Sequence, residues 1–315
     1  MSDYLFLANR TDVFFVVSII IPTFVVMKQT ASRLLNVGGR LISLSRPQVM
    51  GILNCTPDSF YAGSRQQTEQ EIVSRANLIV DEGAQMIDVG AYSTRPGAER
   101  VSEEEEMRRL RFALSLVRRE QPDAVISVDT FRPDVAKMAV EEYGAGIIND
   151  VSGGNPNGVF GSTVSPSAEM ITADYPPMFR MVAQLQVPYV LMSSAATIHD
   201  MILGFARQVQ QMRDLGQKDI ILDPGFGFGK TIAQNYELLK QLQQLQMMQL
   251  PVLVGLSRKS MIWRQLDVTP EESLNGTTAL HMASLMKGVS LLRVHDVKMA
   301  VESIELFLAM ERVEE

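Results

Sequence analysis

Val125-Ile-Ser-Val-Asp129 is a short apolar run, rich in β-branched residues, that ends on a carboxylate. Runs of this length and composition are typical of buried parallel strands. The pattern recurs along the chain, clearly in most cases and less clearly in one. The other runs are Val49-Met-Gly-Ile-Leu-Asn54, Met86-Ile-Asp-Val-Gly90, Gly146-Ile-Ile-Asn-Asp150, Tyr189-Val-Leu-Met-Ser193, Ile220-Ile-Leu-Asp223, Val252-Leu-Val-Gly-Leu-Ser257 and Leu291-Leu-Arg-Val-His295. We therefore expect a parallel sheet with polar groups at its carboxyl edge.

Segments with helical periodicity lie between these runs, so strand and helix alternate throughout the chain. The segments span about 68–83, 102–120, 133–143, 166–186, 199–215, 233–249, 271–287 and 296–311. Alternation of this kind requires parallel pairing with right-handed crossovers. The chain is therefore predicted to be α/β, with a single (β/α)8 TIM barrel whose functional residues gather at the C-terminal rim.

Ahead of the first predicted strand lies a predicted hairpin, Leu35-Asn-Val-Gly-Gly-Arg-Leu-Ile-Ser-Leu44, with a Gly-Gly turn between apolar flanks. We expect it to plug the bottom of the barrel, so that residues 34–315 form one domain. Residues 1–33 are expected to be an N-terminal extension, disordered or not native, since Met27 offers an alternative start. The apolar stretch 13–27 is shorter than the about 20 residues that a membrane span needs, so no membrane partner is predicted.

Composition narrows the class of protein. The chain has 315 residues, 46% of them hydrophobic, and a formal net charge of -7. No long basic tract is present, so nucleic acid is not an expected partner. The single Cys55 excludes an intrachain disulfide and a cysteine-built metal site. A reducing compartment, the cytoplasm, is therefore predicted.

A run of four glutamates, Glu103-Glu104-Glu105-Glu106, begins the second predicted helix. Ser102 with Glu105 three residues later indicates a capping box. Consecutive helical residues point in different directions, so the run is interpreted as a solvated first turn that complements the helix dipole, and not as a metal site.

Three further stretches combine glycine with polar side chains: Asn54-Cys-Thr-Pro-Asp-Ser-Phe60, Asp223-Pro-Gly-Phe-Gly-Phe-Gly-Lys230 and Gly255-Leu-Ser-Arg-Lys-Ser260. The second is not a Walker A motif, because Pro224 stands where that motif needs glycine. Its glycines are interpreted as a tight strand-to-helix turn, which leaves Asp223 unexplained as a carboxylate closing an apolar strand.

Together with other motifs, these stretches resemble the dihydropteroate synthases of the pterin-binding barrel family. The motifs are Val49–Phe60, Ser93-Thr-Arg-Pro-Gly97, Ser127-Val-Asp-Thr130, Ile148-Asn-Asp150, Leu222–Lys230, Ser257-Arg-Lys-Ser260 and Arg293-Val-His-Asp-Val297. They occur in the family's order and spacing over roughly residues 34–311. The resemblance implies condensation of 6-hydroxymethyl-7,8-dihydropterin pyrophosphate with p-aminobenzoate, giving dihydropteroate and pyrophosphate.

The resemblance also implies roles for individual residues. Asp129, Asp223 and Lys259 would be catalytic, and the pterin would bind Asp129, Asn149, Asp223, Lys259 and Met192. Pyrophosphate would bind Thr94, Arg95, Arg293 and His295. The p-aminobenzoate site would comprise Phe60, Thr94, Pro96, Phe228, Lys259 and Ser260. Asn54 would offer its amide oxygen to Mg²⁺, which keeps most of its waters and takes ligands from phosphate. Sulfonamides are expected to compete with p-aminobenzoate, and family members are usually homodimers.

The chain departs from the family pattern after the fifth barrel strand. Met192-Ser193-Ser194-Ala195-Ala196 stands where the family usually has Met-His-Met and a longer loop. Tyr92 and Ala62 also replace acidic or amide residues. The alternative reading is therefore a non-catalytic or weakly active pterin-binding paralogue. A pterin barrel that passes a methyl group to a corrinoid is disfavoured, because it has no pyrophosphate for Arg293 and His295 to hold.

Overall fold

The structure is a computed structural model that describes residues 34–55, 65–92, 101–154 and 175–312. The chain divides into two units, Met1–Thr30 and Ala31–Glu315, and every described residue belongs to the second. The predicted extension and the apolar stretch 13–27 lie outside the described residues.

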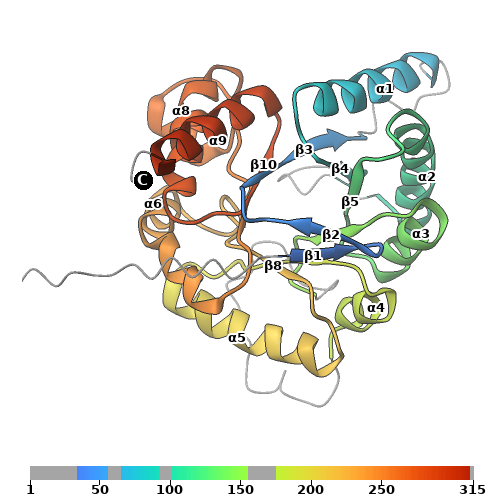
Figure 1. The fold of residues 1–315 in the computed structure, drawn as a ribbon, viewed down its shortest axis with the longest axis horizontal. Coiled ribbons are helices and arrows are strands. Elements are labelled where there is room, and N and C mark those ends of the chain that lie inside the picture. The colour runs from blue at the N-terminus through green and yellow to red at the C-terminus, as the bar shows by residue number, and fades with distance from the viewer. Residues whose placement is uncertain (1–33, 56–64, 93–100, 155–174, 313–315) are drawn as a thin grey trace, which may run out of the picture. The chain divides into compact units, whose positions relative to one another are not determined.

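An eight-stranded parallel sheet forms the centre of the fold, in the order β8-β7-β6-β5-β4-β3-β10-β9 (Figure 1). The strands are β3 (Gln48–Asn54), β4 (Met86–Gly90), β5 (Val125–Asp129), β6 (Ile147–Asp150), β7 (Tyr189–Met192), β8 (Ile220–Asp223), β9 (Leu253–Val254) and β10 (Leu291–Val294). A parallel bridge between Leu222 and Val252 joins the two ends of this order. The predicted (β/α)8 barrel is therefore confirmed.

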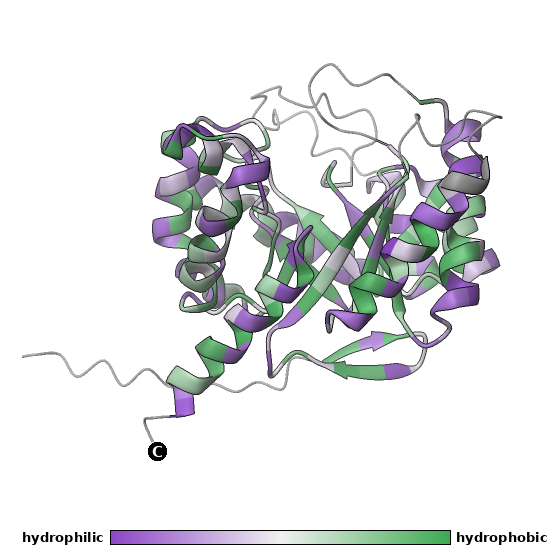
Figure 2. Ribbon diagram, turned by 90° about the horizontal axis from the view of Figure 1, so that it is seen from above, coloured by the Kyte–Doolittle hydropathy of each residue, from purple (hydrophilic) through white to green (hydrophobic). Residues whose placement is uncertain are grey.

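Helices surround the strands, as Figure 2 shows. They are α1 (Arg65–Asp81), α2 (Glu103–Glu120), α3 (Pro133–Tyr143), α4 (Pro177–Leu185), α5 (Ile198–Asp214), α6 (Ile232–Gln241), α7 (Ser260–Leu266), α8 (Leu274–Leu285) and α9 (Val297–Arg312). Two predicted helices contain 3₁₀ segments, since η3 (Leu242–Met248) continues α6 and η4 (Glu271–Ser273) precedes α8. Residues 166–174 of the predicted segment 166–186 lie outside the described residues, and α4 accounts for most of the remainder.

The hairpin is also confirmed. β1 (Leu34–Val37) pairs antiparallel with β2 (Arg40–Ser43), and Gly38 and Gly39 both have positive φ, as a two-residue primed turn requires. Figure 2 shows the hairpin crossing one end of the strands. Leu35 and the following Leu44 are buried against the first inward layer of the barrel. That layer consists of Met50, Met86, Ile147, Val190, Ile221, Leu253 and Leu291.

Because side chains alternate along a strand, the residues two positions further on also point into the barrel. They form a mostly polar layer of Asp88, Ser127, Asn149, Asp223 and Arg293, in which Ile52 and Met192 are apolar. The apolar layer and the hairpin close the bottom of the barrel, while the polar layer lies toward the carboxyl ends of the strands. This arrangement places most of the predicted strand-borne site residues inside one rim.

Candidate active site

Arg293 on β10 links two carboxylates across the inside of the barrel. Its Nε lies 2.6 Å from Asp88 Oδ2, and its Nη2 lies 2.6 Å from Asp129 Oδ2. Burial acts to lower the pKa of Arg293, but the two carboxylates outweigh it and hold the pKa above its ordinary value. Burial raises the pKa of Asp129 to about 7, although Arg293 opposes the rise. The Asp129 side chain keeps 19% of its surface exposed, so it remains accessible at the rim.

Asp88 organises the neighbouring polar side chains. It is fully buried in β4 and accepts hydrogen bonds from Ser127 Oγ at 2.5 Å and Asn149 Nδ2 at 3.0 Å, as well as from Arg293. These bonds orient the Asn149 amide and leave its oxygen as the acceptor for a further donor. The sequence predicted the strand that carries Asp88, but no role for Asp88 itself. The signal was present, since a carboxylate in the middle of a buried strand requires a partner.

Asp223 and Lys259 form the second charged group of the rim. Asp223 is buried and accepts the Gly225 N–H at 2.8 Å. Burial raises its pKa, while Lys259 acts in the opposite direction. Burial lowers the pKa of Lys259 to about 8, and Asp223 partly restores it. Charges on Asp129 and Arg293 also act on Lys259, so the two charged groups share one site.

The Lys259 side chain also forms part of the wall of the site. Its Nζ donates to the carbonyl oxygen of Phe226 and lies 4.4 Å from the centre of the Phe228 ring. Ser260 follows as the first residue of α7. Lys259, Ser260 and Phe228, three of the residues predicted for p-aminobenzoate, are therefore adjacent.

The loops after β7 and β8 lie against each other. Lys230 Nζ donates to the carbonyl oxygens of Ser193, Gly225 and Phe228, at 3.1, 2.9 and 3.2 Å. At Gly225, with φ of 62°, a Cβ would collide with the Ser193 carbonyl oxygen and lie 3.1 Å from Met192 Cγ. Met192 is buried at this junction. The short β7 loop is thus packed, and Met192 lies beside the turn that binds Asp223.

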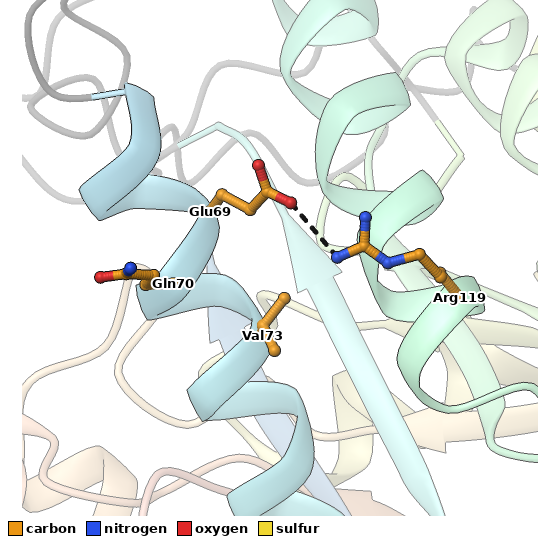
Figure 3. A pocket seen from close by; sticks show the side chains of 4 residues that line it. All are labelled: Glu69, Gln70, Val73 and Arg119. Atoms are coloured by element: carbon orange, nitrogen blue, oxygen red, sulfur yellow. Dashed lines mark hydrogen bonds and ion pairs between the residues drawn. The ribbon is translucent and has the colours of Figure 1, made fainter.

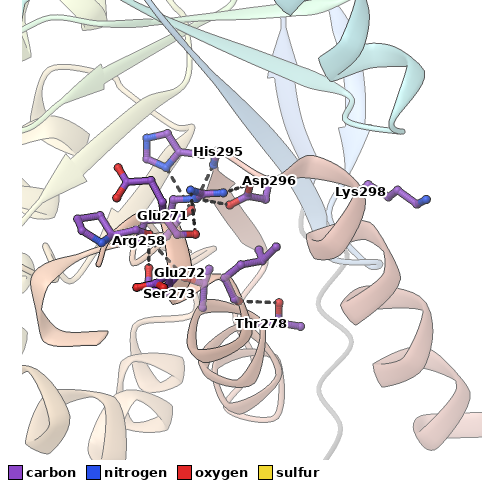
Figure 4. A network of polar contacts seen from close by, with 12 residues as sticks. Arg258, Glu271, Glu272, Ser273, Thr278, His295, Asp296 and Lys298 are labelled. Atoms are coloured by element: carbon purple, nitrogen blue, oxygen red, sulfur yellow. Dashed lines mark hydrogen bonds and ion pairs between the residues drawn. The ribbon is translucent and has the colours of Figure 1, made fainter. Parts of the chain in front are cut away.

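His295 and its surroundings form a polar network just beyond the end of β10 (Figure 4). His295 Nδ1 lies 3.2 Å from Ser257 Oγ. Burial lowers the His295 pKa to about 4, with a contribution from Arg293. Next to it, Arg258 makes a two-point contact with Asp296 at 2.7 and 2.8 Å. A neutral His295 near neutral pH can hydrogen-bond an anion, while Arg293 carries the positive charge.

Asn54 ends β3 and is exposed at the rim. Within the described ranges, no group of three or more His, Cys, Asp or Glu side chains could hold a metal ion. A single amide oxygen fits Mg²⁺, which takes most of its ligands from water and phosphate. The predicted residues Phe60, Thr94, Arg95 and Pro96 lie outside the described part of the chain.

One interpretation of the sequence is wrong in part. Ser102 does cap α2, since its Oγ accepts the Glu105 N–H at 3.2 Å. Glu106, however, is fully buried and is not part of a solvated turn. It accepts hydrogen bonds from Thr130 and Arg132 beyond the end of β5. Glu106 is the one glutamate of the run on the helix face that packs against the strands. The run alone does not show which of its four glutamates lies on that face.

A hollow of about 420 Å³ lies away from this rim, between α1 and α2 (Figure 3). Its lining is Glu69, Gln70, Val73 and Arg119. The Glu69–Arg119 ion pair at 3.2 Å is largely exposed, so it is weak evidence for a binding site. Chemistry is instead concentrated at the carboxyl ends of the strands, where enzymes of this fold place their active sites.

Known proteins share this architecture. A family model described as pterin binding enzyme matches residues 50–295. Over 275 residues the chain is 38% identical to the dihydropteroate synthase of Escherichia coli (strain K12), covering 85% of this chain and 93% of that relative. The dihydropteroate synthase of Bacillus subtilis (strain 168) is 37% identical over 270 residues, covering 83% and 88%.

Solved structures of dihydropteroate synthases are similar to this chain in fold and in sequence. The Xanthomonas albilineans dihydropteroate synthase with 4-aminobenzoic acid matches with a TM-score of 0.76 and 35% identity, covering 89% of this chain and 98% of that one. The enzyme of the same species in complex with 7,8-dihydropteroate matches with a TM-score of 0.74 and 34% identity, covering 88% and 98%. The chain belongs to the pterin binding enzyme family and, within it, to the dihydropteroate synthases.

Proposed function

We propose that this chain condenses 6-hydroxymethyl-7,8-dihydropterin pyrophosphate with p-aminobenzoate, releasing 7,8-dihydropteroate and pyrophosphate. The observation that carries the proposal is the convergence of Asp129, Asn149, Asp223, Lys259 and Arg293 inside one barrel rim. Relatives of this chain are named for the same reaction and cover most of its length. No comparison supports the alternative of a non-catalytic paralogue.

The pterin edge presents a ring N–H and an exocyclic amine, both of them hydrogen-bond donors. Asp223, Asp129 and the oriented Asn149 oxygen supply acceptors, and an ionised acceptor makes the stronger bond. Lys259 donates to the carbonyl side of the ring, and Met192 contributes an apolar contact. Because these groups are fixed before substrate arrives, they lose little energy to reorganisation during the reaction.

Loss of pyrophosphate takes the electron pair of the C–O bond and leaves positive charge on the pterin methylene. Asp129 and Asp223 stabilise this charge electrostatically when they are ionised. The amine nitrogen of p-aminobenzoate then forms the new C–N bond and gives up a proton. Arg293 and His295, with Thr94 and Arg95, bind the departing pyrophosphate.

Asn54 is proposed to hold Mg²⁺ beside the diphosphate, where the ion would offset negative charge on the leaving group. Its exposed position at the end of β3 is compatible with an ion that remains mostly hydrated.

The p-aminobenzoate ring is proposed to lie against Phe228 and the alkyl stem of Lys259, with Phe60, Thr94 and Pro96 completing the wall. Its carboxylate would be bound at Ser260, the first residue of α7. A sulfonamide has a similar ring and a similarly placed polar group, so it should compete for this site. The Yersinia pestis enzyme has been solved with a pterine-sulfa conjugate.

A cytoplasmic homodimer is the assembly that we propose, with small molecules and no nucleic acid as partners. No described helix is both long and apolar enough to cross a membrane.

Turnover by the purified full chain tests the proposal. Pyrophosphate release and 7,8-dihydropteroate formation should require both substrates and Mg²⁺, and the two products should appear in equal amounts. Pyrophosphate release that does not depend on p-aminobenzoate would indicate hydrolysis. Pterin binding without turnover would instead support the paralogue.

A further inference from the structure

Glu106 is a fully buried carboxylate that the proposed reaction does not use. It lies in the first turn of α2, where its neighbours Glu103–Glu105 remain at least partly exposed. Its Oε1 accepts the Thr130 hydroxyl at 2.7 Å, and its Oε2 accepts Arg132 Nη1 at 2.5 Å. A charge buried to this degree is costly unless paired, so the pairing with Arg132 fixes its place.

Thr130 is held from three directions. Besides donating its hydroxyl to Glu106, it donates its N–H to the Asn149 carbonyl oxygen at 3.0 Å. Its Oγ1 also accepts the Arg132 N–H at 3.2 Å. Thr130 directly follows Asp129, the last residue of β5. Bonds that fix Thr130 therefore also fix the backbone from which the Asp129 carboxylate extends toward Arg293.

Arg132 completes the cluster and ties it to neighbouring elements. Its Nη2 donates to the Val101 carbonyl oxygen at 2.7 Å. The guanidinium lies 5.4 Å from the centre of the Tyr92 ring and 5.2 Å from that of Phe131, and the two rings pack edge to face. With these contacts the Arg132 side chain is only 17% exposed. Its positive charge therefore acts chiefly on Glu106 and on the two rings.

We propose that Thr130 and Glu106 are positioning residues that hold the Asp129 carboxylate in its reactive orientation, with Arg132 as the counter-charge. This inference rests on the proposed function, because it assigns Asp129 a part in the reaction. None of the three residues needs to touch a substrate. A displacement of about 1 Å in a reacting group is enough to reduce a rate by roughly a hundredfold.

The cluster also acts on the charge of Asp129. The charges that act on that carboxylate include Arg293 from β10, Asp88 from β4, Glu106 from α2, Asp150 from β6 and Lys259 next to α7. Burial is the main cause of its raised pKa, and the negative charge of Glu106 adds to the rise. Neutralising Glu106 should therefore lower the pKa of Asp129.

Thr130→Val and Thr130→Ser form a matched pair for the test, because valine keeps the shape and serine keeps the hydroxyl. In Thr130→Val, kcat should fall by roughly tenfold to a hundredfold, while the KM for p-aminobenzoate stays unchanged. Thr130→Ser should restore most of the rate. Urea midpoints measured alongside show whether each variant is folded.

Carbon-13 NMR titration of Asp129 gives a second measurement that does not depend on turnover. Glu106→Gln should lower the Asp129 pKa, whereas Glu142→Gln should not. Glu142 is a suitable control because it makes a two-point ion pair with Arg111 on the outer face of α2 and α3, at 2.9 Å for both contacts.

These experiments distinguish failure of the proposed function from failure of the positioning role. A wild-type protein without turnover contradicts the proposed function, and the NMR titration still tests the placement of Asp129. Full activity in folded Thr130→Val, failure of serine to rescue it, or an unchanged Asp129 pKa in Glu106→Gln each overturns the positioning role.

Discussion

At the scale of single residues, Arg293 and Asp88 show how tertiary structure completes what a motif begins. The two are 205 positions apart in the chain, yet their side chains meet at 2.6 Å. The motif around Arg293 predicted a cation at the rim, and the structure places one there. Its partners could not be predicted, because which strands face each other across a barrel depends on closure and register.

Replacing Arg293 by methionine should destabilise the protein in a pH-dependent way. The change leaves the Asp88 and Asp129 carboxylates without their cation, and breaking a buried pair costs about 3–5 kcal/mol. The loss in unfolding free energy should be largest at pH 8 and smaller at pH 5, where Asp129, with a pKa of about 7, is protonated. Urea denaturation at the two pH values measures this difference.

Arg111→Met is the matched control, since it removes an exposed ion pair with Glu142. Its effect should be small at both pH values. An Arg293→Met variant as stable as the wild type at pH 8 would contradict the assigned ion pairs.

The pH dependence of kcat/KM should be bell-shaped, because kcat/KM reports the ionisations of the free enzyme. Asp129 must be ionised to stabilise positive charge, so the rate should fall as the pH drops below about 7. Lys259 must be protonated to donate to the pterin, so the rate should fall as the pH rises above about 8. Stopped assays from pH 5 to 10, a range of roughly two units beyond each limb, measure both limbs.

Two variants test which residue causes each limb of this pH profile. Lys259→Arg should shift the alkaline limb upward, because arginine keeps its proton throughout this range. Asp129→Asn should be slow and lack the acid limb. A flat profile in the wild type would show that neither group controls the rate.

At the scale of elements, strands were the most predictable part of the fold. Buried parallel strands are continuous apolar runs, so the eight runs could be recognised directly, and the Gly38-Gly39 turn identified the hairpin. Helix ends were less predictable because 3₁₀ turns share helical periodicity, as in η3 and η4. A partner for Asp88 could have been predicted from its place in a buried strand. The burial of Glu106 could not, because it depends on how α2 packs.

The hairpin should contribute stability without contributing to catalysis. Leu35 is 1% exposed in the bottom layer, so Leu35→Ala should lower the unfolding free energy by roughly 2–4 kcal/mol. The kcat of the folded variant should be unchanged, because the polar layer lies toward the other end of the strands. Thermal unfolding and turnover measured together test this separation.

Leu41→Ala provides the comparison on the same hairpin, because Leu41 is 64% exposed and should tolerate the change. Equal destabilisation by both substitutions would show that the hairpin does not plug the barrel through Leu35.

At the scale of the whole molecule, the barrel separates stability from chemistry. The hairpin and the apolar layer close one end of the strands, and the charged residues of β4, β5, β8 and β10 meet toward the other. Similarity to a dihydropteroate synthase covers 85% of the chain. The whole barrel, and no single motif, therefore supports the proposed reaction.

Calorimetric binding of 7,8-dihydropteroate to the wild type and to Asp223→Asn decides whether this rim is a pterin site. Asp223 is buried at the rim, and its carboxylate is the proposed acceptor for the pterin edge. We expect the wild type to bind and the folded Asp223→Asn protein to bind at least tenfold more weakly, a loss of about 1.4 kcal/mol. Equal affinities in the two folded proteins would contradict this expectation.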